Sequence, residues 1–185
     1  MQLWNSIAIC IICANLSAQT EPGYGFADDY IPELAQFEYY RGHWVSEMEM
    51  KQEDGSFKKL EFVATIKGRF LDDHKTYQSE FSSGKRFFST DIRTYNTATN
   101  EWQAFFLNAK AQRWHTFTSK VINGKMTTIV KGGYSGKEKF DVKIVDTVID
   151  DGRYLKNVYH STDQMGTWDL VYKMSVNKIE RPEID

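Results

Sequence analysis

The sequence predicts an all-β protein, an antiparallel up-and-down barrel of about ten strands preceded by a short helix. From Trp44 onward, apolar and polar residues alternate with the period of two that is typical of strands. Turn-forming pairs such as Asn123-Gly124 and Asp151-Gly152 interrupt this alternation every roughly 8–12 residues. The connections are too short for the crossover helices that parallel strands need, so we expect antiparallel pairing throughout.

The expected elements follow one another along the chain. A short helix is predicted over residues 32–40, where Pro32 occupies a first-turn position that needs no N–H. A closed barrel of the strands that follow would leave no unpaired edge. The expected strands are 44–50, 60–66, 70–81, 86–95, 102–108, 113–121, 126–134, 138–148, 154–162 and 167–177.

Length and composition limit the function classes. The chain has 185 residues, a length that indicates one domain with a hydrophobic core. Of these residues 41% are hydrophobic and 15% aromatic, a composition that is too apolar for a disordered chain. The formal net charge is -2 and no Lys/Arg-rich block occurs, so a nucleic-acid partner is not expected.

The N-terminal 30 residues differ from the rest. Residues 1–18 contain an uncharged apolar run that is too short to span a bilayer, and they resemble a secretory signal peptide. A buried N-terminal helix is the alternative. Both cysteines, Cys10 and Cys13, lie in this run, so the mature chain would have no disulfide. We expect a flexible tail over 19–30 and a single domain over 31–185, secreted or periplasmic, without a membrane span, and monomeric or homodimeric.

The expected pairing within each hairpin predicts which polar residues share a face of the sheet, because residues paired across an antiparallel hairpin point to the same side. A turn at Ser83-Gly84 would place His74 opposite Arg93. Pairing Tyr95 with Trp102 and Asn108 with Arg113 then continues the same side across the next strands. The expected face carries His74, Asp91, Arg93, Tyr95, Asn108, Arg113 and His115 among Phe87, Trp102, Phe106 and Phe117.

Loop lengths decide whether this face lines the barrel interior. A three-residue loop at 67–69 places it inside, whereas a two-residue loop there would turn Leu71, Lys75 and Tyr77 inward. The side taken by His160 depends in the same way on the loop at 150–152. Since a slip of one residue exchanges the two faces, both arrangements stay open, and the first is our working prediction.

An inward face would give these residues chemical roles. The predicted catalytic residues are His115 as a base, Asp91 as the carboxylate that orients it, and Tyr95 as an alternative proton carrier. Arg93 and Arg113 would bind a substrate carboxylate or sulfate. On an outward face, the same residues would be ordinary surface pairs that keep the barrel soluble. The predicted substrate site is completed by His74, Asn108 and Trp102.

Gly42-His43-Trp44, after the short helix and at the start of the first strand, resembles the G-x-W signature of the lipocalin-like (calycin) superfamily. The tracts 66–71 and 95–102 are similar to a bacterial lipocalin-like family of unknown function, and the likeness covers roughly residues 33–177. This resemblance implies an internal cavity and assigns no chemistry. Nitrobindin-type haem barrels are relatives, but residues 42–46 lack their glycine-rich extension, so no cofactor is expected.

Two functions from different classes remain. The first is a secreted enzyme of polysaccharide degradation, a carbon–oxygen lyase that performs β-elimination at a uronic acid of an anionic oligosaccharide. In size, N-terminal segment and predicted barrel, the chain resembles small secreted proteins of marine polysaccharide degradation, including an ulvan-oligosaccharide dehydratase. The alternative is a non-enzymatic periplasmic barrel that binds a small apolar ligand. No metal is expected, because the acidic pairs at 72–73 and 150–151 lack calcium-loop spacing.

Overall fold

A computed structural model describes residues 23–84, 86–135 and 138–179 of the chain. In this part of the chain, one 3-10 helix precedes a series of strands, so the predicted all-β class is confirmed. The elements are η1 (Pro32–Tyr40), β1 (Gly42–Lys51), β2 (Phe57–Lys59), β3 (Ala64–Phe70), β4 (Tyr77–Ser82), β5 (Phe88–Asn96), β6 (Glu101–Asn108), β7 (Arg113–Ile122), β8 (Lys125–Ser135), β9 (Glu138–Asp150), β10 (Arg153–Ser161) and β11 (Asp169–Lys178).

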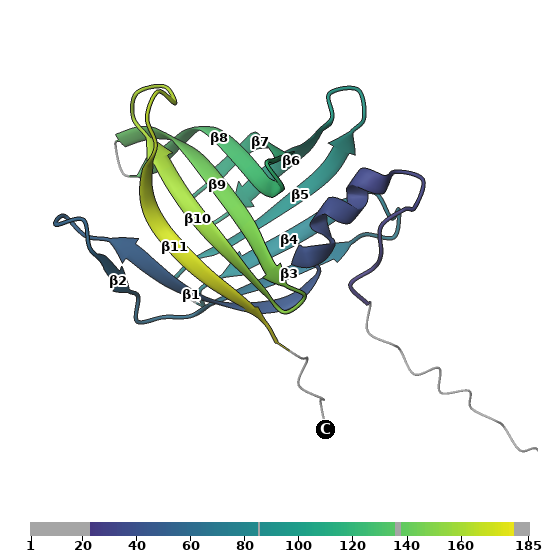
Figure 1. Cartoon of the computed structure of the whole chain (residues 1–185), viewed down its shortest axis with the longest axis horizontal. Helices are drawn as coiled ribbons and strands as arrows, with labels where there is room; N and C mark the ends of the chain where they lie inside the picture. The colour runs from purple at the N-terminus through teal and green to yellow at the C-terminus, as the bar shows by residue number, and fades with distance from the viewer. Residues whose placement is uncertain (1–22, 85, 136–137, 180–185) are drawn as a thin grey trace, which may run out of the picture.

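The strands form one antiparallel sheet that closes on itself (Figure 1). Sequence neighbours pair from β3 to β11, and β1 closes the barrel by pairing with both β3 and β11. Within the described residues the sheet has 11 strands; β2 pairs with β1 alone, so ten strands form the wall. The predicted up-and-down lipocalin-like barrel is therefore confirmed.

The helix η1 closes one end of the barrel (Figure 1). Its side chains Leu34, Phe37 and Tyr40 are fully or almost fully buried in the main core. The indole N–H of Trp44 donates to the Tyr40 carbonyl at 3.0 Å, which satisfies a backbone acceptor at the helix end. Gly42, between helix and strand, has φ +121°, a conformation that favours glycine. The G-x-W motif therefore joins the helix to the barrel wall.

Burial along the strands identifies the inner wall. Residues at alternate positions are buried near η1 and only half-buried towards the opposite end, which we call the mouth. The mouth carries the connections 52–56, 83–87, 109–112 and 162–168. Because inward side chains near the mouth keep some solvent exposure, the interior is open to water from that end.

Two predicted loops differ from the structure. Residues 67–69 are not a loop: Gly68 lies inside β3, which continues to Phe70 and turns at residues 71–76. The turn near Ser83-Gly84 is wider than predicted, so Tyr77, rather than His74, faces Arg93. The first change reverses the side taken by the residues of β4, and the second reverses the relation between β4 and β5, so the predicted side is restored from β5 onward. Arg93 therefore faces inward as predicted, whereas the predicted pair of His74 and Arg93 is wrong.

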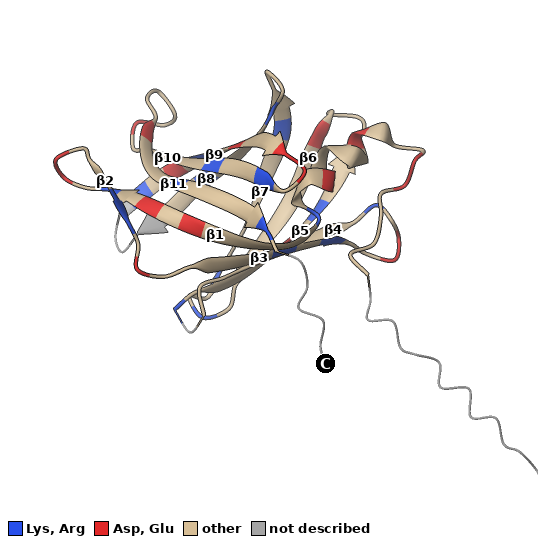
Figure 2. Cartoon of the chain, turned by 60° about the horizontal axis from the view of Figure 1, so that its bottom comes forward, with Lys and Arg blue, Asp and Glu red and all other residues tan. Residues whose placement is uncertain are grey.

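Charged residues of both signs lie on the strands and on the connections between them. Figure 2 shows Lys and Arg positions interspersed with Asp and Glu positions along the strands and connections. No helix in the described part of the chain is long and apolar enough to cross a membrane. Residues 1–18, for which a signal peptide is predicted, lie outside the described residues.

Part of the predicted tail, residues 23–30, lies against the closed end of the barrel. The carbonyl of Tyr24 accepts a hydrogen bond from the N–H of Phe70 at 2.9 Å, and the carbonyl of Gly25 accepts one from Arg41 at 2.8 Å. The N–H of Asp28 donates to the carbonyl of His74 at 2.8 Å. These contacts attach the segment to β3 and the β3–β4 turn.

Candidate functional site

Histidine and aromatic side chains line the inner wall near the mouth. The imidazole of His115 on β7 stacks on Phe106 of β6, with ring centroids 4.8 Å apart. On β10, His160 stacks on Phe140 of β9 at 4.1 Å, and its ring meets the edge of Tyr172 at 6.2 Å. Both histidines are half-buried. The mouth therefore presents two imidazoles in a largely aromatic wall.

Both imidazoles favour the neutral form. Burial, with repulsion from the Arg113 guanidinium, lowers the pKa of His115 below its ordinary value. Burial also lowers the pKa of His160, although Asp169 partly opposes this. A neutral imidazole has one nitrogen free to accept a proton, so each histidine can act as a base near neutral pH.

Deeper in the barrel, Arg93 of β5 forms a buried ion pair. Its Nε and Nη2 donate to the two carboxylate oxygens of Asp91 at 2.5 and 3.0 Å, and Ser79 Oγ donates to Asp91 at 2.7 Å. The guanidinium lies over the rings of Phe37 at 4.6 Å and Phe117 at 5.4 Å. Although burial disfavours its charge, the neighbouring Asp91 raises the pKa of Arg93, which stays protonated.

A second buried pair comes from the other side of the barrel. Lys156 Nζ on β10 donates to both carboxylate oxygens of Asp146 on β9 at 2.7 and 2.9 Å. The hydroxyl of Tyr39 in η1 donates to Asp146 at 2.7 Å. Lys156 also lies 5.1 Å from the ring centroid of Tyr40. Burial opposes the charge, yet Asp146 raises the pKa of Lys156 above its ordinary value.

These two ion pairs form the floor of the open part of the barrel, and we call them the polar floor. The side chains of Arg93 and Lys156 are 9% and 12% exposed, and both face inward, so the solvent that reaches them lies inside the barrel. The polar floor has no net charge, because each cation is matched by a carboxylate. It offers hydrogen-bond donors and acceptors to a ligand whose other surfaces meet aromatic rings, which is the usual composition of a small-molecule site.

Several predicted site residues lie together in the structure. Asp91, Phe106 and His115 are opposite one another on three adjacent strands, and Asn108 is opposite Arg113 at the mouth, all as predicted. The structure does not place Asp91 against His115, however. The ring of Phe106 lies between them in this row, and Asp91 is bound to Arg93 and Ser79. Asn108 Oδ1 accepts the N–H of Ala111 at 3.0 Å, so it also stabilises the mouth turn.

Three other predicted site residues lie at the closed end. His74 is in the β3–β4 turn with φ +56°, and its ring stacks on Phe26 at 4.0 Å outside the barrel. Trp102 is fully buried, and its indole donates to Gln36 at 3.2 Å. Tyr95 packs edge-on against Trp102 at 5.7 Å. The structure therefore does not bring these residues together with His115, and their predicted roles stay predictions.

Sequence reasoning missed Lys156, Asp146 and Tyr39. The sequence shows only that Asp146 and Lys156 lie in the two strands on either side of Asp151-Gly152. A tight turn there pairs Asp150 with Arg153, but a bulge before Tyr154 shifts the register by one residue and brings Asp146 opposite Lys156. Period-two alternation cannot reveal such a bulge.

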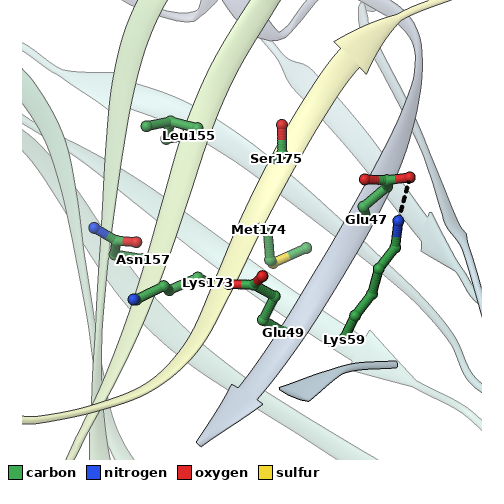
Figure 3. A pocket seen from close by; sticks show the side chains of 8 residues that line it. All are labelled: Glu47, Glu49, Lys59, Leu155, Asn157, Lys173, Met174 and Ser175. Carbon is green, nitrogen blue, oxygen red and sulfur yellow. Dashed lines mark hydrogen bonds and ion pairs between the residues drawn. The ribbon is translucent and has the colours of Figure 1, made fainter. Parts of the chain in front are cut away.

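The outer wall holds a shallow pocket between β1, β10 and β11 (Figure 3). An ion pair of 2.7 Å joins Glu47 to Lys59 across β1 and β2, and Lys173 lies 3.9 Å from the ring centroid of Phe57. The two acidic and two basic residues of this pocket balance in charge, and it lies outside the barrel interior, so we do not consider it the principal site. In the described residues, no three His, Cys, Asp or Glu side chains gather in a way that could hold a metal ion.

The fold and the inner wall define a lipocalin-like barrel whose interior is open at one end. No family model matches the sequence, and no curated protein does. Among solved structures, 12 chains match. One is the S-type phycobiliprotein lyase CPES from Guillardia theta, with TM-score 0.50 and 9% sequence identity over 79% of this chain and 92% of that chain. At this identity the likeness shows the fold alone.

Proposed function

We propose that the protein is a secreted carbon–oxygen lyase that acts on a uronic acid at the end of an anionic oligosaccharide bound inside the barrel. The observation that supports this most is His115, a neutral, solvent-reachable imidazole on the inner wall, two residues along the same strand from Arg113. The sugar's C–H faces would pack on the ring of Phe106, and its hydroxyls would reach the polar floor.

In this proposal, elimination proceeds without a cofactor. His115 removes the proton at C5, the C4–C5 double bond forms, and the bond from C4 to its hydroxyl oxygen breaks. The imidazolium then returns the proton to the departing oxygen, which leaves as water. The guanidinium of Arg113 stabilises the negative charge that develops on the uronate carboxylate. Arg93 lies deeper in the barrel, where its guanidinium is bound to Asp91, so we assign it to the polar floor.

The test uses the purified protein and a panel of uronic-acid oligosaccharides, ulvan fragments included, with detection of the unsaturated uronate by its ultraviolet absorbance. We expect His115→Ala to lower turnover by about 10²-fold or more, as for loss of a general base. His43→Gln is the matched control, since this histidine lies at the β1–β3 pairing on the outer side of the wall. Turnover that survives in His115→Ala, or a flat trace with every substrate, would refute the elimination.

A second candidate is a non-enzymatic barrel that binds a small apolar ligand. It is favoured by the aliphatic and aromatic side chains that pack against the inner clusters, and by floor cations that are already paired. Native mass spectrometry of the purified protein would then show a co-purified molecule. The inward-facing aromatic and aliphatic residues of the open part include Met48, Phe81, Phe106, Val142 and Val158.

Secretion is a proposal as well, supported by the apolar run in residues 1–18. Mass spectrometry of the protein secreted by its host cells should find an N-terminus close to residue 19. Retention of residues 1–18 in the mature protein would contradict it.

A further inference from the structure

A second surface with binding character lies on the outside of the barrel, over β5, β6 and β7. We call it the neutral face, the outward positions of residues 88–94, 103–107 and 114–118. Trp114 is 71% exposed there, an unusual state for so large an apolar side chain, and Phe105 is 45% exposed. Phe88 and Ile92 are exposed beside them.

The strand register makes these side chains one continuous surface. Ile92 lies opposite Phe105, and Phe105 lies opposite Thr116. Leu107 lies opposite Trp114 on the next row towards the mouth. Side chains opposite one another on adjacent strands touch or nearly touch, so the rings and aliphatic groups form a single platform.

The neutral face combines apolar side chains with uncharged polar ones. None of its outward positions is Asp, Glu, Lys or Arg, although 26% of the whole chain is charged. Threonine hydroxyls alternate with the apolar groups instead, at Thr90, Thr94, Thr116 and Thr118. An apolar ring beside neutral hydrogen-bonding groups matches a pyranose, which has an apolar C–H face surrounded by hydroxyls.

The area of the neutral face indicates which kind of partner could bind there. Strands about 4.8 Å apart with a rise of about 3.3 Å per residue give an area of roughly 300 Å² for three strands of this length. A stable protein dimer buries about 800 Å² on each partner. The platform is thus too small for a lasting dimer and fits about two or three sugar rings.

We propose that the neutral face is a surface binding site for polysaccharide, with Trp114 and Phe105 as the rings on which sugars stack. It is separate from the barrel interior and would hold the protein on a polymer whatever the interior binds. Binding there uses no ion pairs, so it should persist at high salt, where charge-dependent adsorption is screened.

Affinity electrophoresis in gels that contain xylan or ulvan tests this proposal against gels without polysaccharide. We expect the protein to be retarded at low and at high salt, and Trp114→Ala to weaken binding by at least about tenfold, which corresponds to about 1.4 kcal/mol. Trp114→Tyr should retain much of the retardation, because a tyrosine ring still stacks. Tyr30→Ala is the matched control, since Tyr30 is an aromatic residue that is 95% exposed and lies outside the neutral face, so this variant should bind like the parent protein.

Three results would overturn the proposal. These are an absence of retardation in every polysaccharide gel, equal retardation of Trp114→Ala, and retardation that salt abolishes. A homodimer that Trp114→Ala converts to a monomer in sedimentation would assign the face to self-association instead, and flotation with neutral phosphatidylcholine vesicles would assign it to lipid. Turnover in the elimination assay is read separately, so failure here leaves that proposal intact.

Discussion

At the scale of single residues, the polar floor poses the clearest energetic question. Removing two charges from water costs several kcal/mol per ion, and a buried pair recovers this only with good geometry and further hydrogen bonds. Asp146 has both, because Lys156 binds its two oxygens and Tyr39 donates to one of them. Removing one charge of this pair should therefore lower the free energy of unfolding much more than removing both charges.

Lys156→Met is expected to destabilise the protein by about 3–5 kcal/mol, since it leaves the Asp146 carboxylate buried without its cation. Urea unfolding measures this. The double variant Lys156→Met/Asp146→Leu removes both charges and should recover most of the lost free energy of unfolding. If the single and double variants were equally destabilised, the pairing would not be the source of the effect.

The titration of His115 depends on its neighbour Arg113. Because repulsion from this guanidinium contributes to the low pKa of His115, Arg113→Gln should raise that pKa towards its ordinary value. NMR titration of the imidazole C–H signals measures the shift directly, with His43 as an internal reference. An unchanged His115 titration in the variant would show that burial alone lowers the pKa.

The same pKa has a consequence for stability, and its sign can be worked out. The pKa of His115 is lower in the folded protein than in the unfolded chain, so the unfolded chain binds the proton more readily. This contribution to stability is fully present above the unfolded value and is lost as the pH falls through the folded value. Arg113→Gln should therefore reduce the fall in Tm between about pH 7 and pH 5.

At the scale of strands and turns, the sequence predicts element type better than register. The alternation of apolar residues identified most of the strands, but residues 60–63 and 71–76 were predicted as strand and are not, and β2 was not predicted. The pairs of Tyr95 with Trp102 and of Asn108 with Arg113 are correct. Gly68 was misread as a turn residue. It is a strand glycine, because the hydroxyl of Tyr77 occupies the place of a side chain, and no local pattern encodes such a contact made across the sheet.

Some residues of the candidate site were predicted from the sequence, and others were misplaced or missed. His115 and Arg113 lie on the same side as Arg93, as predicted, because the β5–β6 and β6–β7 hairpins have the predicted pairing. Arg93 itself faces inward because the errors at 67–69 and near 83–84 cancel. His74 was misplaced by the errors at the β3–β4 turn, and Lys156 was missed because a bulge before Tyr154 shifts its partner. Bulges and loop lengths are set by tertiary packing, which single-sequence periodicity does not contain.

The contact between β3 and β4 gives a prediction at this scale. A Cβ at position 68 would lie 1.8 Å from Tyr77 Oη and 2.4 Å from the Tyr40 carbonyl oxygen, so Gly68→Ala must displace buried atoms. We expect a loss of several kcal/mol in thermal or urea unfolding. The variant should still be less stable than the parent after Tyr77→Phe is added, because the Tyr40 carbonyl remains in the way.

Tyr77→Phe alone is the informative control. The Tyr77 hydroxyl is buried without a hydrogen-bond partner among the described residues, so its removal should be neutral or stabilising by up to about 1 kcal/mol. It should also reduce the effect of Gly68→Ala in the double variant. Full additivity of the two changes would show that the hydroxyl is not the obstacle.

At the scale of the whole molecule, η1 connects opposite parts of the barrel wall. Phe37 packs against Tyr77 of β4 at 5.3 Å and Trp102 of β6 at 4.7 Å. Tyr39 and Tyr40 pack against Tyr154 of β10 at 5.3 and 5.4 Å. A helix that contacts both sides of a closed sheet couples the strands to one another, so the closed end should not unfold in parts.

Unfolding of the barrel is therefore expected to be a single cooperative transition. Near-ultraviolet circular dichroism reports the aromatic packing around Phe37, and far-ultraviolet circular dichroism reports the strands, so the two curves should coincide in urea. Phe37→Ala removes the ring that joins Tyr77, Trp102 and Arg93, and it should lower the free energy of unfolding by about 3–5 kcal/mol while both curves shift together. Loss of the aromatic signal ahead of the strand signal in the parent protein would mean that η1 detaches first and that the strands close the barrel without it.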